Sequence, residues 1–269
     1  MAIKLVAIDT DGTLLNSAGQ ILARTKAAIT EALNQGIKIV LCSGRPIAGL
    51  KSYMTELGIT GPEQYAVTLN GAITRDADDK IITKDLVNNE LYRKMTAFAL
   101  AHKLPFNVVD EDSHIITANH NIDYVVYLQA YENTAPLYVR TPDELPDSFS
   151  VAKGCFVGES ELLNRYQDSI TAEFGKDLYV IRSDPHFIEL LNPKVNKGNG
   201  LKELCATLNI DASEVMALGD ERNDIPMFNF AGTGVCMGNG SQQAKEQADY
   251  ITSSNDNDGI SQAFTKFVF

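Results

Sequence analysis

The stretch that decides the fold is IKLVAIDTDGTLL, residues 3–15. It opens with a short apolar run and then turns abruptly acidic at Asp9-Thr10-Asp11-Gly12-Thr13. An apolar run of this length before a glycine-containing turn is typical of a strand that is buried on both faces of a parallel sheet. The two carboxylates would then lie at the carboxyl end of this strand, where open α/β sheets bind their ligands.

The spacing of Asp9 and Asp11 carries chemical information. If the strand persists through both residues, their side chains point to the same side, because side chains alternate along a strand. Two carboxylates in one pocket repel each other, so the pocket needs a cation or a shared proton. Gly12 allows a sharp turn, and Thr13 offers a hydroxyl and a backbone N–H to an anion. The plain alternative is a surface turn, whereas an EF-hand loop would need a third ligand before the glycine and a later Glu.

The composition restricts the partners of the chain. Its 269 residues suffice for one large domain or two ordinary ones. The formal net charge of −12 disfavours nucleic acid and anionic membranes as partners, because both depend on a positive field. A small anionic substrate would need a local cation, supplied by a metal ion or by basic side chains.

The sequence also predicts a cytoplasmic location. No stretch approaches the apolar length that spans a bilayer, and the first strand begins directly after Met1 and Ala2, so we expect no signal peptide. The cysteines form no C-x-x-C pair. We expect buried free thiols in a reducing compartment at all four positions, Cys42, Cys155, Cys205 and Cys236.

Strands and helices alternate through the first third of the chain. Apolar side chains recur at helical spacing in residues 21–36, and residues 37–41 and 65–69 are typical of short buried strands. Pro46 suits the first turn of a helix that ends before Gly58. This alternation predicts a parallel sheet with crossover helices.

The middle of the chain has a different pattern. Helical segments near 89–102 and 162–175 are mixed with hairpin-like pairs of short strands, which is typical of an α+β domain. The strand–helix alternation returns after Asn192-Pro193. We therefore predict an α/β core domain formed by residues 1–83 and 191–269, with an α+β domain inserted at 84–190.

Four segments with chemical groups follow predicted strands or begin predicted helices. They are the Asp9/Asp11 pair, Ser43, Lys197, and Gly219-Asp220-x-x-Asn223-Asp224. Taken singly, Ser43 could be a helix cap, Lys197 a surface lysine, and the last segment an acidic helix start. Taken together, they describe one pocket with carboxylates, a hydroxyl, an ammonium and an amide. Such a pocket suits phosphoryl transfer with Mg²⁺, and the sequence has neither a P-loop nor a G-x-G-x-x-G pattern.

These segments carry a resemblance to a known family. Asp9-Thr10-Asp11-Gly12-Thr13, Ser43-Gly44-Arg45-Pro46, Asn196-Lys197-Gly198 and the segment 219–224 resemble the four motifs of the haloacid dehalogenase superfamily. The insert, Asn70-Gly71 and residues 234–239 resemble its Cof-type branch, subclass IIB, which includes sugar phosphatases. The resemblance implies a doubly wound, Rossmann-like parallel sheet with an inserted α+β cap domain that closes over the substrate.

The resemblance also implies a role for each matched residue. Asp9 would attack phosphorus and form an aspartyl-phosphate, and Asp11 would act as general acid and then as general base. Mg²⁺ would be held by Asp9, by the main-chain carbonyl of Asp11 and by Asp220, with Asp224 in a supporting role. The phosphate oxygens would be bound by Thr10, Ser43, Gly44, Lys197 and Asn223.

We thus predict a Mg²⁺-dependent phosphatase that acts on a small phosphorylated metabolite, in particular a sugar phosphate. Two alternatives use the same kind of core: a phospho-accepting or phosphate-binding regulatory protein, and a phosphomutase. The leaving group would be selected by the inserted domain. The candidates for this selection, each of which also has a surface or packing explanation, are Arg45, His114, His120, Lys153 and His186.

Overall fold

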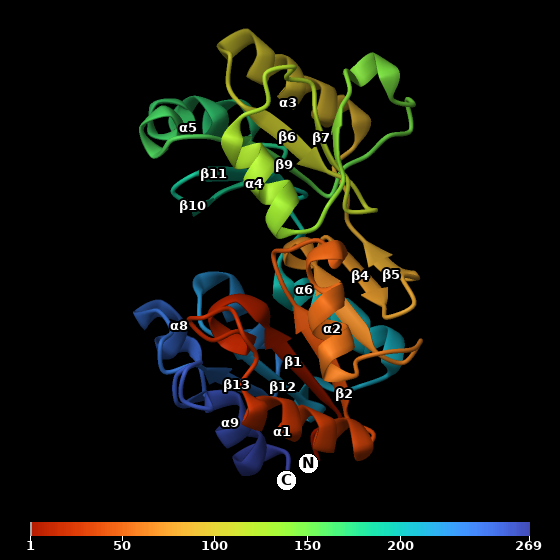
Figure 1. Cartoon of the computed structure of the whole chain (residues 1–269), viewed down its shortest axis with the longest axis vertical. Helices are drawn as coiled ribbons and strands as arrows, with labels where there is room; N and C mark the ends of the chain where they lie inside the picture. The colour runs from red at the N-terminus through yellow and green to blue at the C-terminus, as the bar shows by residue number, and fades with distance from the viewer. Residues whose placement is uncertain (1) are drawn as a thin grey trace. The chain divides into compact units, whose positions relative to one another are not determined.

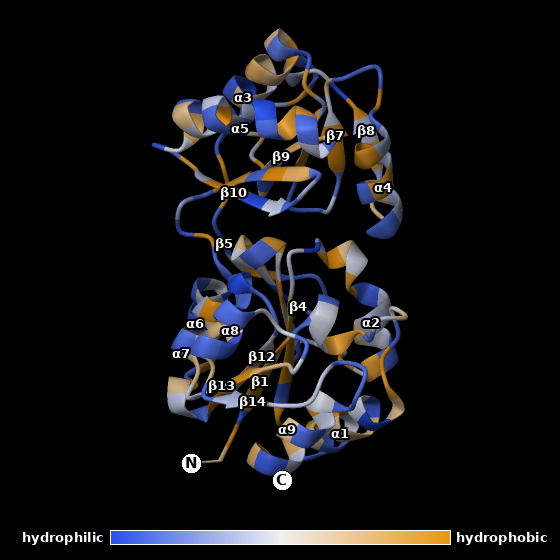
Figure 2. Ribbon diagram, turned by 90° about the vertical axis from the view of Figure 1, so that its left-hand side faces the viewer, coloured by the Kyte–Doolittle hydropathy of each residue, from blue (hydrophilic) through white to orange (hydrophobic). Residues whose placement is uncertain are grey.

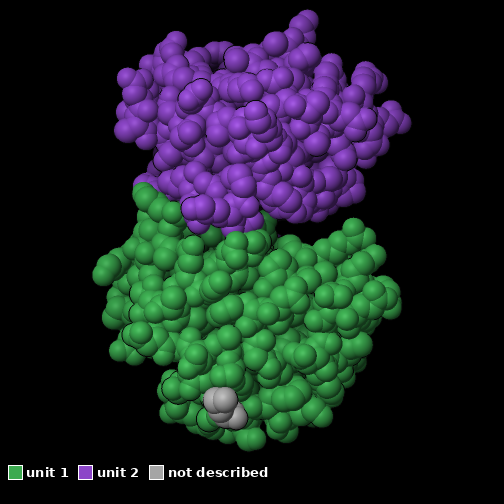
Figure 3. Space-filling model, turned by 180° about the vertical axis from the view of Figure 1, so that it is seen from behind, with its two compact units in different colours: residues 1–44, 50–84, 196–269 green, residues 45–49, 85–195 purple. Residues whose placement is uncertain are grey.

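The computed structural model describes residues 2–269, which form two compact units. Unit 1 comprises Met1–Gly44, Leu50–Lys84 and Asn196–Phe269, and unit 2 comprises Arg45–Gly49 and Asp85–Val195 (Figure 3). The divisions at 84/85 and 195/196 lie within five residues of the junctions that we predicted at 83/84 and 190/191, whereas those at 44/45 and 49/50 were not predicted.

The sequence did not indicate that residues 45–49 group with unit 2. These residues belong to unit 2 because they contact other residues of that unit. The backbone N–H of Ala48 donates to Ser113 Oγ at 3.3 Å, and a Cβ atom on Gly49 would lie 2.6 Å from Asn133 Oδ1. The role of unit 2 as a cap stays a prediction.

Unit 1 is built on one eight-stranded sheet whose order is β14-β13-β12-β1-β2-β3-β4-β5. Strand β1 lies between β12 and β2 and is parallel to both, with every residue buried. Among the described residues of this sheet, β4 is antiparallel to both β3 and β5, and the other neighbouring strands are parallel. The bounds are β1 Leu5–Asp9, β2 Lys38–Cys42, β3 Tyr65–Thr68, β4 Ile73–Asp76, β5 Ile81–Lys84, β12 Val215–Gly219, β13 Thr233–Cys236 and β14 Tyr250–Ile251.

Helices cover both faces of this sheet, which confirms the predicted doubly wound α/β fold (Figure 1). One face packs against α6 (Lys197–Leu208), α7 (Ile225–Phe230) and α8 (Gln242–Gln247). On the other face α1 (Ala23–Asn34) contacts β2, α2 (Lys51–Leu57) and α9 (Gly259–Phe267). Strands β1 and β12 lie between the two layers and are buried throughout, and they are largely apolar in Figure 2.

The strand order reverses between β1 and β12. From β1 the chain proceeds to β2 and β3 on one side, and it returns later to β12 and β13 on the other. Doubly wound sheets bind ligands beside such a reversal, at the carboxyl ends of the strands. The ends that meet here are Asp9 of β1 and Gly219 of β12.

The first strand is shorter than its sequence pattern allowed. It ends at Asp9, and residues Thr10–Leu14 form a wide helical turn instead of continuing through Asp11. Gly12 makes this turn possible because its φ of 79° belongs to the left-handed region. A Cβ atom at this position would also lie 2.3 Å from Asp220 Oδ2. Asp9 is therefore buried while Asp11 is exposed, and strand alternation does not align their side chains.

The helix predicted to begin near Pro46 begins later. A short turn at Ile47–Gly49 precedes α2, which starts at Lys51, so the proline does not occupy the first turn of the helix. The same shift separates Ser43 from the helix start, and the interpretation of Ser43 as its cap was wrong. The predicted end is confirmed, since Gly58 closes α2 with a φ of 71°.

Unit 2 contains a six-stranded sheet in the order β10-β11-β9-β6-β7-β8. Its pairs are antiparallel except for β7 with β8, and one face packs on α3 and α5 through an apolar core that includes Met95, Phe156 and Phe174. The bounds are α3 Asn89–His102, β6 Phe106–Val109, β7 Ile115–Thr117, α4 Tyr124–Glu132, β8 Leu137–Val139, β9 Lys153–Val157, α5 Ser160–Phe174, β10 Tyr179–Asp184 and β11 Phe187–Leu191.

Two further expectations concern the chain as a whole. All four cysteines are buried and free, as predicted. None of the helices described for residues 2–269 combines the length and the apolar character that crossing a bilayer requires.

Candidate active site

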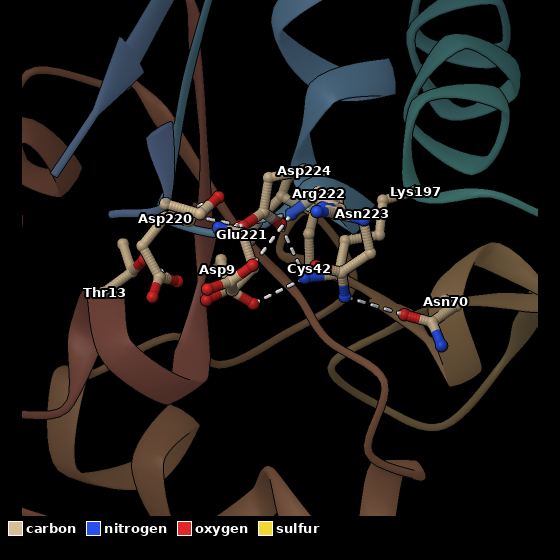
Figure 4. Close-up of polar contacts among 12 residues, drawn as sticks. Asp9, Thr13, Cys42, Asn70, Lys197, Asp220, Glu221, Arg222, Asn223 and Asp224 are labelled. Atoms are coloured by element: carbon tan, nitrogen blue, oxygen red, sulfur yellow. Dashed lines mark hydrogen bonds and ion pairs between the residues drawn. The ribbon is translucent and has the colours of Figure 1, made fainter. Parts of the chain in front are cut away.

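A buried lysine links two segments that are far apart in the sequence. Lys197 is the first residue of α6, after Asn196, whose side chain accepts the backbone N–H of Asn199 and so caps the helix. Its Nζ lies 2.5 Å from Asp9 Oδ1 and 2.7 Å from Asp224 Oδ1 (Figure 4). Because Lys197 is only 1% exposed, the interpretation of this residue as a surface lysine was wrong.

The loop after β12 is held together by Asp224. One oxygen of this carboxylate, Oδ1, contacts Lys197, and the other, Oδ2, accepts the backbone N–H groups of Asp220 at 2.9 Å and Glu221 at 3.0 Å. Both oxygens are thus used within the protein. Asp224 therefore shapes the loop and positions Lys197 at the same time.

Asp220 connects this loop to the turn that follows β1. Its Oδ1 accepts a hydrogen bond from Thr13 Oγ1 at 3.1 Å, so the anion that we expected for the Thr13 hydroxyl is a carboxylate of the protein itself. Oxygen atoms of Asp9, Asp220 and Asp224 lie within 4.8 Å of one another, and all three residues are buried. Two strand ends thereby form one acidic centre.

The protonation behaviour of this centre reflects its crowding. Burial and the nearby Asp224 carboxylate raise the pKa of Asp9 well above its usual value, although Lys197 partly opposes the shift. Burial and Asp224 also raise the pKa of Asp220, to about 6. Burial alone would lower the pKa of Lys197, but Asp224 and Asp9 outweigh it and the pKa is raised.

Three carboxylates against one ammonium leave an excess of negative charge, and hard divalent cations prefer such oxygen donors. Since both Asp224 oxygens already have partners, Asp9 and Asp220 are the carboxylates best able to hold a cation. The donor set therefore fits a divalent metal ion.

The remaining predicted residues lie around the same edge of the sheet. Ser43 is buried and follows Cys42, the register partner of Asp9 in β2, and Gly44 comes next. Thr10 is buried, and its Oγ1 has no hydrogen-bond partner among residues 2–269. Contact of these residues with a phosphate stays a prediction, as does the catalytic role of Asp11.

Two asparagines near the site, Asn70 and Asn239, were not predicted to have a part in it. Asn70 Oδ1 accepts a hydrogen bond from Asn223 Nδ2 at 3.2 Å. Asn239 Nδ2 donates to the carbonyl oxygen of Gly12 at 2.8 Å, and Asn239 Oδ1 accepts the backbone N–H of Asn255. Asn70 and Asn239 lie in stretches that carried the family resemblance, but no pattern in the sequence indicated which group each would contact.

Residues 6–264, nearly the whole chain, match the family of haloacid dehalogenase-like hydrolases. The chain belongs to this family. The resemblance seen in the four sequence motifs is thus confirmed.

Known proteins of this family resemble the hydrolase over its full length. Phosphatase YwpJ of Bacillus subtilis is 31% identical over 287 residues, which cover 96% of this chain and 97% of YwpJ. A solved haloacid dehalogenase-like hydrolase from Bacteroides thetaiotaomicron superimposes with a TM-score of 0.88 and 32% identity, over 98% of this chain and 99% of its own. The solved subclass IIB sugar phosphatase BT4131 is 26% identical with a TM-score of 0.79, over 98% of each chain. This haloacid dehalogenase-like hydrolase is a phosphatase, and it acts on small phosphorylated substrates.

Proposed function

We propose that this hydrolase is a Mg²⁺-dependent phosphatase that hydrolyses sugar phosphates through an aspartyl-phosphate intermediate. The observation that carries the proposal is the placement of Lys197 between Asp9 and Asp224, with the Asp220 carboxylate beside them. A nucleophilic carboxylate, a fixed cation next to it and a second acidic group are what in-line phosphoryl transfer to a protein side chain requires.

The reaction would proceed in two displacements. In the first, a carboxylate oxygen of Asp9 attacks phosphorus, the bond from phosphorus to the ester oxygen breaks, and Asp11 gives its proton to the departing alcohol. In the second, a water molecule attacks the phosphorus of the aspartyl-phosphate while Asp11 takes a proton from that water. The bond between phosphorus and Asp9 then breaks, which releases inorganic phosphate and restores both carboxyl groups.

The other residues would bind and orient the phosphate. Lys197 supplies a fixed positive charge, and the buried Thr10 hydroxyl that has no partner in the described chain supports the presence of a polar ligand beside it. Ser43 and Asn223 would add further hydrogen bonds. Mg²⁺, held by Asp9, Asp220 and the main-chain carbonyl of Asp11, would neutralise negative charge that Lys197 alone does not balance.

The sugar-phosphate substrate is proposed because BT4131, which is similar along the whole chain, is named a sugar phosphatase. We further propose that unit 2 selects among leaving groups, since the core residues described above address only the phosphate. A panel of sugar phosphates, sugar-alcohol phosphates and nucleotides would identify the class of leaving group.

Hydrolysis of p-nitrophenyl phosphate tests the mechanism. We expect activity with Mg²⁺, loss of activity in chelator, and recovery when Mg²⁺ is restored. Asp9→Asn should reduce kcat by at least about a thousand-fold, as the loss of a catalytic nucleophile does in other enzymes. The matched control is Asp78→Asn, which changes an exposed carboxylate of the same unit. Substantial turnover by Asp9→Asn, or turnover indifferent to chelator, would contradict the proposal.

A further inference from the structure

A strained turn follows β3 directly. Its residues Leu69, Asn70 and Gly71 have φ values of 53°, 58° and 100°, so three consecutive residues adopt positive φ. Gly71 does so readily and Asn70 tolerates it, but a bulky residue such as Leu69 adopts this conformation rarely. Backbone strain of this kind persists only where the surroundings determine the conformation, and it gathers at functional sites.

The surroundings of the turn include two segments of the candidate active site. The backbone N–H of Asn70 donates to the carbonyl oxygen of Ser43 at 2.9 Å, and the backbone N–H of Ser43 donates to the Val67 carbonyl at 2.9 Å. On its other side, the turn packs against the start of α6. A Cβ atom on Gly71 would lie 2.3 Å from the carbonyl oxygen of Asn196, the residue before Lys197.

The side chain of Asn70 reaches a third segment. Its Oδ1 accepts the hydrogen bond from Asn223 Nδ2 at 3.2 Å, and Figure 4 shows this oxygen directed toward Asn223. The Asn70 amide also lies against Gly44, where a Cβ atom would come within 3.3 Å of both Asn70 Nδ2 and Oδ1. Asn70 therefore contacts the segments that contain Ser43 and Asn223, while the next residue contacts the start of the helix that carries Lys197.

We propose that Asn70 is a positioning residue for phosphate binding, acting chiefly through Asn223. Its Oδ1 fixes the orientation of the Asn223 amide, and its backbone N–H fixes the carbonyl end of Ser43. This inference rests on the proposed function, in which Asn223 and Ser43 bind the phosphate. The family resemblance included Asn70-Gly71 but implied no role for either residue, and this proposal assigns one to Asn70.

The variant Asn70→Gly separates the side chain from the backbone, because glycine adopts positive φ without strain. Loss of one neutral hydrogen bond predicts about a 3- to 10-fold rise in KM for p-nitrophenyl phosphate and in the inhibition constant of inorganic phosphate. The matched control is Asn209→Gly, since Asn209 is also an asparagine at positive φ in unit 1, but at the exposed end of α6. We expect the control to leave KM, the inhibition constant and kcat unchanged, and both variants to keep the Tm of the wild type within a few degrees.

A double-mutant cycle tests whether Asn70 acts through Asn223. If it does, Asn70→Gly combined with Asn223→Ala binds phosphate no more weakly than Asn223→Ala alone. Losses that add fully in the double variant would overturn the positioning role, as would an unchanged KM and inhibition constant in Asn70→Gly. A wild-type enzyme without Mg²⁺-dependent phosphatase activity would instead refute the proposed function, so the two failures are distinguishable.

Discussion

Replacement of Lys197 by methionine tests the electrostatic structure of the site most directly. Lys197 contacts Asp9 at 2.5 Å and Asp224 at 2.7 Å, and the side chains of the three residues are 1%, 7% and 0% exposed. Removal of one partner from a buried ion pair costs about 3 to 5 kcal/mol of unfolding free energy, because a buried charge is left without compensation. Methionine has a similar shape, so the cavity contribution is small, and we expect a loss in this range.

The loss should depend on pH in a defined direction. In the folded protein the pKa of Asp9 is already raised by burial, and without Lys197 it would rise further. The folded variant then binds a proton that the unfolded chain, with an ordinary pKa near about 3.9, has already released. Stability of the variant relative to wild type is therefore greatest at low pH, and it falls as pH rises from about 4 through the raised pKa of Asp9.

The assay is urea unfolding in chelator at about pH 5 and about pH 7.5; both lie above the ordinary pKa of an aspartate, so the loss should be larger at the higher pH. The matched control is Lys4→Met, which removes a 2.7 Å pair in the same unit whose lysine side chain is 58% exposed and whose Glu214 side chain is 17% exposed, and which should therefore cost much less. If Lys197→Met costs no more than Lys4→Met, or costs the same at both pH values, the description of a buried, coupled centre is wrong.

Three further changes test other parts of the molecule. The variant Asp11→Asn should still become phosphorylated but should turn over slowly. The enzyme quenched in acid during turnover should therefore carry a phosphoryl group that hydroxylamine removes. Rapid steady-state turnover of an alkyl phosphate by this variant would show that Asp11 is not the general acid and base. Mg²⁺ should raise Tm more at about pH 7.5 than at about pH 5, because protons compete with the metal ion for Asp220, whose pKa is about 6. The variant Asp220→Asn should lose most of this increase in Tm at both pH values. Lys153→Met in unit 2 should lower the free energy of unfolding by about 3 to 5 kcal/mol, because it leaves buried Glu189 without its 2.6 Å partner. Lys94→Met removes an exposed pair of the same unit and should cost much less; equal losses would contradict this.

The sequence predicts the core of unit 1 well because its elements repeat strong local patterns. The apolar run before Asp9 and the helix that Lys197 begins are both visible without a structure. The convergence of Asp9, Lys197, Asp220 and Asp224 follows from parallel topology, since the carboxyl ends of parallel strands share one edge. These features required only local composition and the order of the segments.

Features that depend on distant contacts were harder to predict. The end of β1 at Asp9 depends on close packing of Gly12 against Asp220, which is remote in the sequence. Helix α4, with the sequence YVVYLQAYE, is rich in aromatic and β-branched residues that favour strands, yet it forms a helix capped by Asp123. Strand β9 was missed because Lys153 and Gly154 are untypical of a buried strand, although both are buried.

The reversal of strand order beside β1 has a consequence for the folding of the nascent chain. Strand β1 can pair with β2 soon after synthesis begins, but its other neighbour, β12, emerges only after the continuous segment Asp85–Val195 has been made. We therefore expect that segment to reach its native structure on the ribosome first, because domains fold as units during synthesis. The first strand would meanwhile keep one edge unpaired, and we expect the contact between Asp9 and Lys197 to form among the last events of folding.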